Sequence, residues 1–249
     1  MKTEYFKFYS SHIGREMELK VYGHRGKPML VFPSSGGRFI EYEDFKIIEA
    51  VKDFIDQGLI QVYAVDSVDN ESWLDNYKLP LERARRHNDY DRYIVDELVP
   101  FIKHHGGYQG GLIATGCSMG GYHSANFFFR HPDIFDTLIA LSGIYDARFF
   151  VGENLHFQEV YLNSPVDYLK EIGNVYLELY RKNNIIVCTG QGAWEEDSVR
   201  DSQYLEWVLS NRGVGGWFDY WGYDVNHDWP WWRIQMPYFL GQLHSQGKL

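Results

Sequence analysis

Residues 112–123 read LIATGCSMGGYH, and this stretch gives the strongest indication of the fold. Leu112–Thr115 is a short apolar run that suits a buried strand, and helix-like spacing begins at Ser118. Gly116, Ser118 and Gly120 form the pattern G-x-S-x-G, which places a serine hydroxyl on a sharp turn between a strand and a helix. A side chain two residues before or after that serine would collide with neighbouring backbone, so glycine is needed at both positions. The stretch therefore predicts a nucleophilic Ser118; a tight structural turn without chemistry is the alternative.

The chain on either side of this stretch alternates strand-like and helix-like segments, without repeats or linkers. We therefore predict a single α/β domain over residues 1–249. It has a mostly parallel central sheet, an antiparallel pair of strands at the N-terminus, helices on both faces and a small insertion near residues 143–184. The predicted strands are 5–9, 17–22, 28–32, 60–65, 112–115, 137–141, 185–188 and 217–221. The predicted helices are 43–55, 89–105 with a kink at Pro100, 118–129, 175–181, 197–211 and 231–243.

The composition argues against several classes of function. The 249 residues carry 24 Lys and Arg against 34 Asp and Glu, and a net charge of −10 disfavours non-specific binding to nucleic acid. No apolar run approaches the roughly 18 residues of a membrane helix, and the polar residues 1–20 resemble neither a secretory signal nor a transit peptide. Cys117 and Cys188 lie in apolar runs, which predicts two buried, reduced thiols. We therefore expect a cytoplasmic protein whose partners include neither nucleic acid nor membrane.

Aromatic residues are abundant, at 17% of the chain, and most of the tryptophans fall in its C-terminal third. Two interpretations stay open at this point. The aromatic side chains form either a lid over a thick core or the wall of a pocket for an apolar or planar group. A surface rich in aromatic residues is also compatible with a homo-oligomer.

A serine nucleophile needs a base, and His227 is the best placed of the ten histidines. It lies in the sequence DVNHDWP (residues 224–230), between the last predicted strand and the last predicted helix. In enzymes built on this kind of turn, the order along the chain is nucleophile, acid, base, and His227 completes that order. A turn histidine satisfied by Asp224 or Asp228 is the alternative. The remaining histidines are interpreted as structural or solvent-exposed: His12, His24, His87, His104, His105, His123, His131, His156 and His244.

The acid should follow the strand 185–188, where three carboxylates compete. Its role is to accept the Nδ1–H of the base and to stabilise the imidazolium. Glu195 lies nearest the strand and follows a glycine-rich turn, so we favour it as the acid. Asp197 is placed like a helix N-cap, and Glu196 like a solvated charge in the first helical turn. Asp197 and Glu196 remain alternatives.

Two backbone N–H groups are expected to form the oxyanion hole. Met119 directly follows the nucleophile and begins a helix, whose N-terminus favours negative charge. The second donor should come from the loop PSSGG (residues 33–37), where we favour Ser35, with Gly36 next. A plain chain-reversing turn is the alternative for this loop.

A known family is recognisable in the run from Tyr93 through Asp146, which contains GCSMGG at 116–121, His-Pro-Asp at 131–133 and Leu-Ser-Gly at 141–143. This run resembles the esterase branch of the α/β-hydrolases, which includes S-formylglutathione hydrolases of the esterase D type, enterochelin esterases, feruloyl esterase modules and mycolyltransferases. The resemblance implies an α/β-hydrolase fold and carboxylic ester hydrolysis, with Ser118 as nucleophile, His227 as base and Glu195 as acid. Two features depart from the branch: Pro33-Ser34 stands where a His-Gly pair is common, and the acid is commonly Asp.

The residues thus favour a serine esterase that acts on a small-molecule ester through an acyl-enzyme and needs no metal or organic cofactor. An acyltransferase or a thioesterase would use the same site. A non-catalytic binding protein on the same fold is a further alternative, because fold alone does not determine function. A metal-dependent hydrolase using His104 and His105 is disfavoured, since adjacent histidines on a helix point in different directions.

Overall fold

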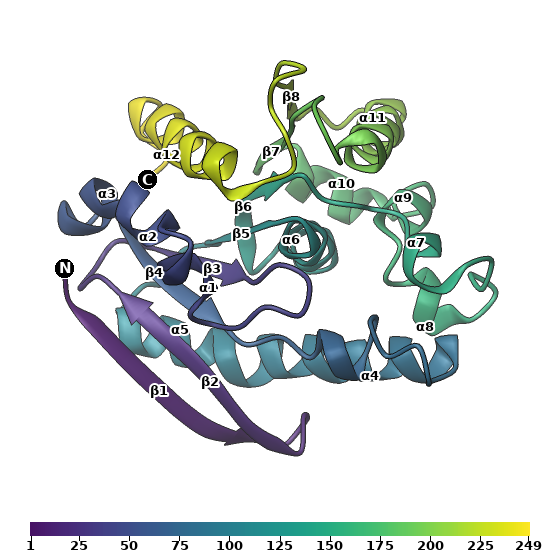
Figure 1. Ribbon diagram of the computed structural model, residues 1–249, viewed down its shortest axis with the longest axis horizontal. Coiled ribbons are helices and arrows are strands. Elements are labelled where there is room, and N and C mark those ends of the chain that lie inside the picture. The colour runs from purple at the N-terminus through teal and green to yellow at the C-terminus, as the bar shows by residue number, and fades with distance from the viewer.

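The computed structural model describes residues 1–249, and its centre is one eight-stranded sheet with strand order β1-β2-β4-β3-β5-β6-β7-β8 (Figure 1). β1 pairs antiparallel with β2, and β2 pairs antiparallel with β4, whereas all pairs from β4 to β8 are parallel. The mostly parallel sheet with an antiparallel N-terminal pair is therefore confirmed. The strands are β1 (Thr3–Ser10), β2 (Arg15–Tyr22), β3 (Lys27–Phe32), β4 (Ile60–Val65), β5 (Leu112–Cys117), β6 (Phe135–Leu141), β7 (Asn184–Thr189) and β8 (Trp217–Tyr220).

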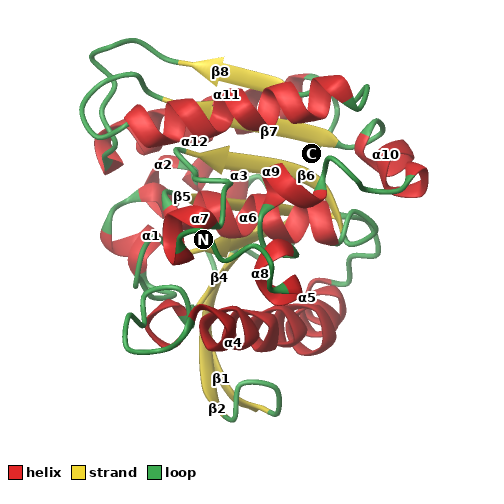
Figure 2. Cartoon of the chain, turned by 90° about the vertical axis from the view of Figure 1, so that its right-hand side faces the viewer, coloured by secondary structure: helices red, strands yellow, loops and turns green.

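Helices cover both faces of the sheet, as predicted, and each face has its own apolar core. One core joins the sheet to α1–α3 and α12, and the other joins it to α4–α6 and α11. Figure 2 shows the β1–β2 hairpin projecting past α4 at one end of the sheet and β8 at the opposite end. The helices are α1 (Glu41–Asp44), α2 (Ile47–Ala50), α3 (Lys52–Asp56), α4 (Pro80–Arg92), α5 (Val99–Gly106), α6 (Met119–Arg130), α7 (Arg148–Val151), α8 (Gln158–Tyr161), α9 (Pro165–Tyr168), α10 (Asn174–Tyr180), α11 (Glu196–Asn211) and α12 (Trp229–Ser245), with a 3₁₀ turn η1 (Asp69–Glu71) and a π-helical turn η2 (Tyr93–Leu98).

Two predicted helices differ from those observed. The single helix predicted over 43–55 is three short helices, because Lys46 adopts a left-handed φ of 65° and interrupts the chain between α1 and α2. The helix predicted to begin at residue 89 begins instead at Pro80, whose fixed φ suits the first turn. Near Pro100, which lacks an N–H, the chain runs through the π-helical turn η2 before α5 begins. The expected irregularity therefore takes the form of a π-helical segment.

The predicted insertion lies between β6 and β7 and consists of the short helices α7–α10. Its aromatic residues Phe150 and Phe157 pack with Trp73 and Tyr122 in a small core of their own. This places the insertion over the helix that follows Ser118. None of the helices in the structure combines the length and the apolar character needed to cross a bilayer.

Candidate active site

Ser118 lies on the turn between β5 and α6, as the G-x-S-x-G pattern predicts. Its φ of 57° is in the left-handed region, which serine adopts rarely. The two glycines are required by space: a Cβ on Gly116 would lie 2.4 Å from the carbonyl carbon of Gly120, and a Cβ on Gly120 would lie 2.3 Å from the carbonyl oxygen of Phe32. The turn is therefore too tight for a side chain on either flank, and it lifts the Ser118 hydroxyl above the carboxyl ends of the strands.

The structure brings His227 and Glu195 together. His227 Nδ1 lies 3.1 Å from Glu195 Oε2. The loop that carries His227 follows β8 and is tied to the loop after β7, since the His227 N–H donates to the Ala193 carbonyl at 3.0 Å and the Ala193 N–H donates to Asn226 Oδ1 at 2.8 Å. These bonds fix the imidazole beside the carboxylate, with Nε2 free of any protein partner.

Glu195 is 1% exposed, and its carboxylate is surrounded by hydrogen-bond donors. Oε1 accepts from Ser142 Oγ at 2.6 Å and from the Gly190 N–H at 3.3 Å, and Oε2 accepts from Thr189 Oγ1 at 2.9 Å. Ser142 follows β6 and Thr189 ends β7, so the carboxyl ends of two adjacent strands supply these donors. These donors hold the carboxylate in one orientation beside His227. Ser142 and Thr189 were not singled out from the sequence, although residues that end adjacent parallel strands are expected to lie together.

Neither of the other two candidate acids, Glu196 and Asp197, is hydrogen-bonded to His227. The prediction that Asp197 caps a helix is wrong, because α11 begins at Glu196 and the residue in the cap position is Glu195. The side chain of Asp197 is 53% exposed and pairs with Arg200 Nη1 at 2.6 Å. Glu196 is exposed, as predicted. The burial of Glu195 therefore comes from its inward-facing side chain at the start of the helix.

Ser118 and His227 line the same cavity, which has a volume of about 320 Å³. Ser118 Oγ makes no hydrogen bond to another protein group, and hydrogen bonds between catalytic groups are often long or poorly aligned before substrate binds. The cavity also includes Ser35 and Met119, the two predicted oxyanion donors. Its walls are largely apolar and aromatic and include Leu74, Tyr122, Ile144, Phe149, Phe150 and Trp194.

The loop at residues 33–37 is held in place by hydrogen bonds to the carboxylates of Glu41 and Asp69. Ser34 donates from its N–H and its hydroxyl to the two carboxylate oxygens of Glu41, at 2.7 and 2.6 Å. The Gly36 N–H is directed at Asp69 Oδ2, at 3.4 Å. The Ser35 N–H has no protein acceptor, which leaves it available beside the Met119 N–H at the start of α6. Of these two loop residues, Ser35 thus has the free N–H, and its role as an oxyanion donor stays a prediction.

Several other histidines are structural. His123 is fully buried on α6 and its Nε2 lies 2.8 Å from Asp69 Oδ1. His87 is fully buried within α4 and is therefore structural and not solvent-exposed; this burial lowers its pKa well below the usual range. His105 Nδ1 is bound to the Tyr63 hydroxyl at 2.9 Å. No group of three or more His, Cys, Asp or Glu side chains is arranged to hold a metal ion.

Both cysteines are free and buried, as predicted. Burial raises the pKa of the Cys117 thiol and of the Cys188 thiol, because the thiolate is penalised in an apolar environment. Neither side chain lines the cavity beside Ser118. The two thiols are therefore core residues and not competing nucleophiles.

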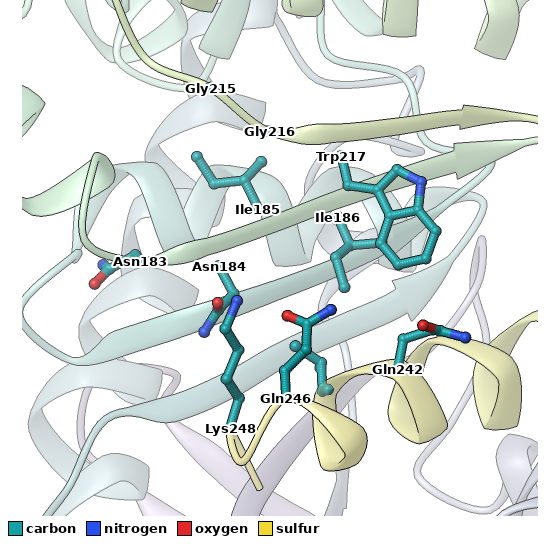
Figure 3. Close-up of a pocket in the computed structure, with 11 residues that line it drawn as sticks. Asn183, Asn184, Ile185, Ile186, Gly215, Gly216, Trp217, Gln242, Gln246 and Lys248 are labelled. Atoms are coloured by element: carbon teal, nitrogen blue, oxygen red, sulfur yellow. The ribbon is translucent and has the colours of Figure 1, made fainter.

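A second recess, of about 260 Å³, lies at the opposite end of the strands (Figure 3). Asn184 begins β7 and Trp217 begins β8, whereas Ser118 follows the end of β5. The recess is lined by four amide side chains, four apolar side chains, two glycines and Lys248, and contains no serine, cysteine or histidine. It therefore lacks a hydroxyl or thiol nucleophile paired with an imidazole base, and the cavity beside Ser118, which has both groups, is the candidate active site.

Comparison with known proteins agrees with this architecture. The sequence profile of the family described as "Putative esterase" matches residues 10–243. No curated protein sequence matches the chain significantly. Among solved structures, the fold is similar to a ferulic acid esterase (TM-score 0.76, 17% identity, 97% of each chain covered) and to an S-formylglutathione hydrolase from Agrobacterium tumefaciens (TM-score 0.74, 13% identity, 96% of this chain and 93% of that one).

A third similar structure is that of FphF, a fluorophosphonate-binding serine hydrolase of Staphylococcus aureus (TM-score 0.70, 14% identity, 97% of this chain and 98% of that one). At these identities the structures establish the fold, and the family profile, which covers nearly the whole chain, establishes the family. The chain therefore belongs to the esterase family of the α/β-hydrolases.

Proposed function

We propose that this protein is a serine hydrolase that cleaves carboxylic esters through an acyl-enzyme. One observation supports the proposal most strongly. The buried Glu195 carboxylate is hydrogen-bonded to His227, and His227 lines the same cavity as Ser118. Ser118 directly follows β5, and Glu195 and His227 lie in the segments after β7 and β8, so all three lie beyond the carboxyl ends of parallel strands. This is the order nucleophile, acid, base along the chain.

The acylation half of the reaction uses these groups in sequence. Ser118 Oγ attacks the acyl carbon of the ester while His227 Nε2 takes the hydroxyl proton. Glu195 accepts the Nδ1–H of His227 and stabilises the imidazolium that forms. The N–H groups of Met119 and Ser35 bind the oxyanion of the tetrahedral intermediate. His227 then gives its proton to the leaving alkoxide, and the acyl group stays on Ser118.

Deacylation repeats these steps with water as the nucleophile. His227 Nε2 removes a proton from water, which attacks the acyl-enzyme, and then returns a proton to Ser118 Oγ as the second tetrahedral intermediate collapses. An acceptor alcohol in place of water would make the same site an acyltransferase, and a thiolate leaving group would make it a thioesterase. The structure contains no feature that favours either over ester hydrolysis.

The cavity wall indicates the kind of substrate. Phe149, Phe150 and Trp194 present aromatic side chains to the cavity that contains Ser118. Apolar walls with a few polar groups are typical of sites that bind small organic molecules. We therefore propose a small-molecule ester with an apolar or planar group next to the scissile bond.

Hydrolysis of a short-chain p-nitrophenyl ester by the wild type and by Ser118→Ala tests the proposal. The wild type should release p-nitrophenol and the variant should fall to the background rate, with both proteins folded by circular dichroism. Equal hydrolysis by the two proteins would contradict it. A non-catalytic binding protein would instead bind the ester without turnover.

A further inference from the structure

Ser142 occupies a strained backbone position beside the acid. Its φ of 51° lies in the left-handed region, which glycine adopts freely and serine rarely. It is 1% exposed, its N–H donates to the Cys188 carbonyl at 2.7 Å, and its own carbonyl accepts from Ser198 Oγ at 3.1 Å. A non-glycine residue persists in such a conformation when its surroundings hold it there, frequently at functional sites. The surroundings of Ser142 therefore hold its side chain in a fixed place beside Glu195.

The Ser142 hydroxyl connects α12 to the acid. Ser142 Oγ lies 2.6 Å from Glu195 Oε1, and Trp232 Nε1 lies 3.0 Å from Ser142 Oγ. An indole N–H can only donate, and a hydroxyl has a single proton to give. Because Trp232 donates to the Ser142 oxygen, the hydroxyl proton is directed at the carboxylate. The direction of donation is thus from Trp232 to Ser142 to Glu195.

Trp232 also contacts the base. Its ring packs against the His227 imidazole with the ring centroids 5.1 Å apart and the planes at 82°. Trp232 is 3% exposed and lies in the first turn of α12, a few residues after the loop that carries His227. Trp232 therefore contacts His227 directly, and it is linked to Glu195 through the hydroxyl of Ser142.

We propose that Ser142 and Trp232 are positioning residues that hold the Glu195 carboxylate in the orientation in which it accepts the Nδ1 proton of His227. This inference rests on the proposed function. Neither residue transfers a proton to substrate. Ser142 borders the cavity, but its hydroxyl is bonded to Glu195 and Trp232, so removal of either side chain lowers kcat through Glu195 and His227 and changes KM little. The hydrogen bond from Ser142 to the buried Glu195 carboxylate is stronger than the bond from Trp232 to Ser142, because its acceptor is charged. We expect its loss to lower kcat about ten- to a hundredfold.

A double-mutant cycle tests this chain of hydrogen bonds. Ser142→Gly removes the hydroxyl and relaxes the strained φ, and Trp232→Phe keeps an aromatic ring against His227 while it removes the N–H. The double variant should have the kcat of Ser142→Gly alone, because the N–H of Trp232 acts only through that hydroxyl. Trp231→Phe is the matched control: Trp231 lies on the same helix, its side chain makes no hydrogen bond, and its replacement should leave kcat unchanged.

The inference is overturned by an unchanged kcat in a folded Ser142→Gly, by effects that multiply in the double variant, or by a rise in KM at constant kcat. Should Ser142→Gly fail to fold, Trp232→Phe decides alone: a lowered kcat supports the inference and an unchanged kcat overturns it. Failure of the proposed function shows itself differently, as a wild type that neither hydrolyses esters nor reacts with a fluorophosphonate. In that event the downfield proton NMR signal of the His227 Nδ1–H tests the hydrogen bonds directly, since Trp232→Phe should shift it and Trp231→Phe should not.

Discussion

His227 Nδ1 lies 3.1 Å from Glu195 Oε2, although 32 positions separate the two residues in the chain. The contact exists because the loops after β7 and β8 are hydrogen-bonded to each other, and it orients the imidazole toward the cavity beside Ser118.

Glu195→Gln should lower kcat by roughly three to four orders of magnitude, because an amide cannot stabilise the imidazolium and can hold the wrong tautomer. Steady-state kinetics with a p-nitrophenyl ester measures the loss. Asp197→Asn is the control: Asp197 borders the same cavity, but it pairs with Arg200 and makes no hydrogen bond to His227, so kcat should stay nearly unchanged. A larger loss in Asp197→Asn than in Glu195→Gln would assign the acid to Asp197.

Gly120→Ala should destabilise the fold by at least about 1–3 kcal/mol, because the added methyl group would meet the Phe32 carbonyl. The obstacle is backbone, which cannot rotate away as a flexible side chain can. Chemical denaturation measures the free energy of unfolding. The control is Gly215→Ala, where nothing lies within 4 Å of the new methyl group and the change should stay within about 0.5 kcal/mol. Equal stability of the two variants would contradict this account of the turn.

His87 should make the protein less stable in mild acid. Burial, reinforced by the neighbouring His123 and Arg130, lowers the pKa of His87 well below its ordinary value of 6.5. The unfolded chain then binds a proton that the folded chain excludes. Stability is therefore full above pH 6.5 and is lost as the pH falls below it, by about 1.4 kcal/mol for each unit of pH until His87 titrates in the folded state.

His87→Phe keeps an aromatic ring among Trp73, Tyr122 and Phe127 and removes this titration. Urea unfolding of both proteins at pH 7 and pH 5.5 makes the comparison. The wild type should lose more stability between these values than the variant does. Parallel pH dependence in the two proteins would show that His87 titrates normally in the folded state.

Trp194→Ala should raise KM for esters with a bulky or aromatic group and leave an acetyl ester nearly unaffected. Trp194 lines the cavity, yet its residue surface is 84% exposed, so its removal opens the rim without disturbing a core. Kinetics with a series of p-nitrophenyl esters of increasing size gives the dependence, and thermal unfolding should show an unchanged Tm. A uniform loss of kcat across the series would instead indicate that Trp194 supports the catalytic groups.

Much of the fold could be predicted from local sequence. Short apolar runs mark the strands correctly because a strand buried on both faces is apolar along its length. The G-x-S-x-G pattern marks the turn at Ser118 because the two glycines are required by backbone contacts that no other residue permits. His227 and Glu195 were placed beside each other from their order after successive strands, and the structure has them in contact. Their chemical roles remain predictions.

The features that were missed depend on tertiary structure. Lys46 breaks a helix whose apolar spacing is continuous, because its left-handed φ is not encoded in that spacing. His87 follows two arginines and yet is buried, since its side chain lies on the inner face of α4. The hydroxyl of Ser142 reaches Glu195 only because β6 and β7 are neighbours in the sheet. Sequence patterns identify elements, but these contacts arise between them.

In the proposed mechanism, Ser118 is a nucleophile activated by His227. The most direct measurement is mass spectrometry of the intact protein after reaction with a fluorophosphonate, followed by mapping of the modified peptide. The account predicts one adduct per chain, located on Ser118, formed rapidly by the wild type and very slowly by His227→Ala. Absence of an adduct on the folded wild type, or an adduct on another residue with Ser118 unmodified, would contradict it.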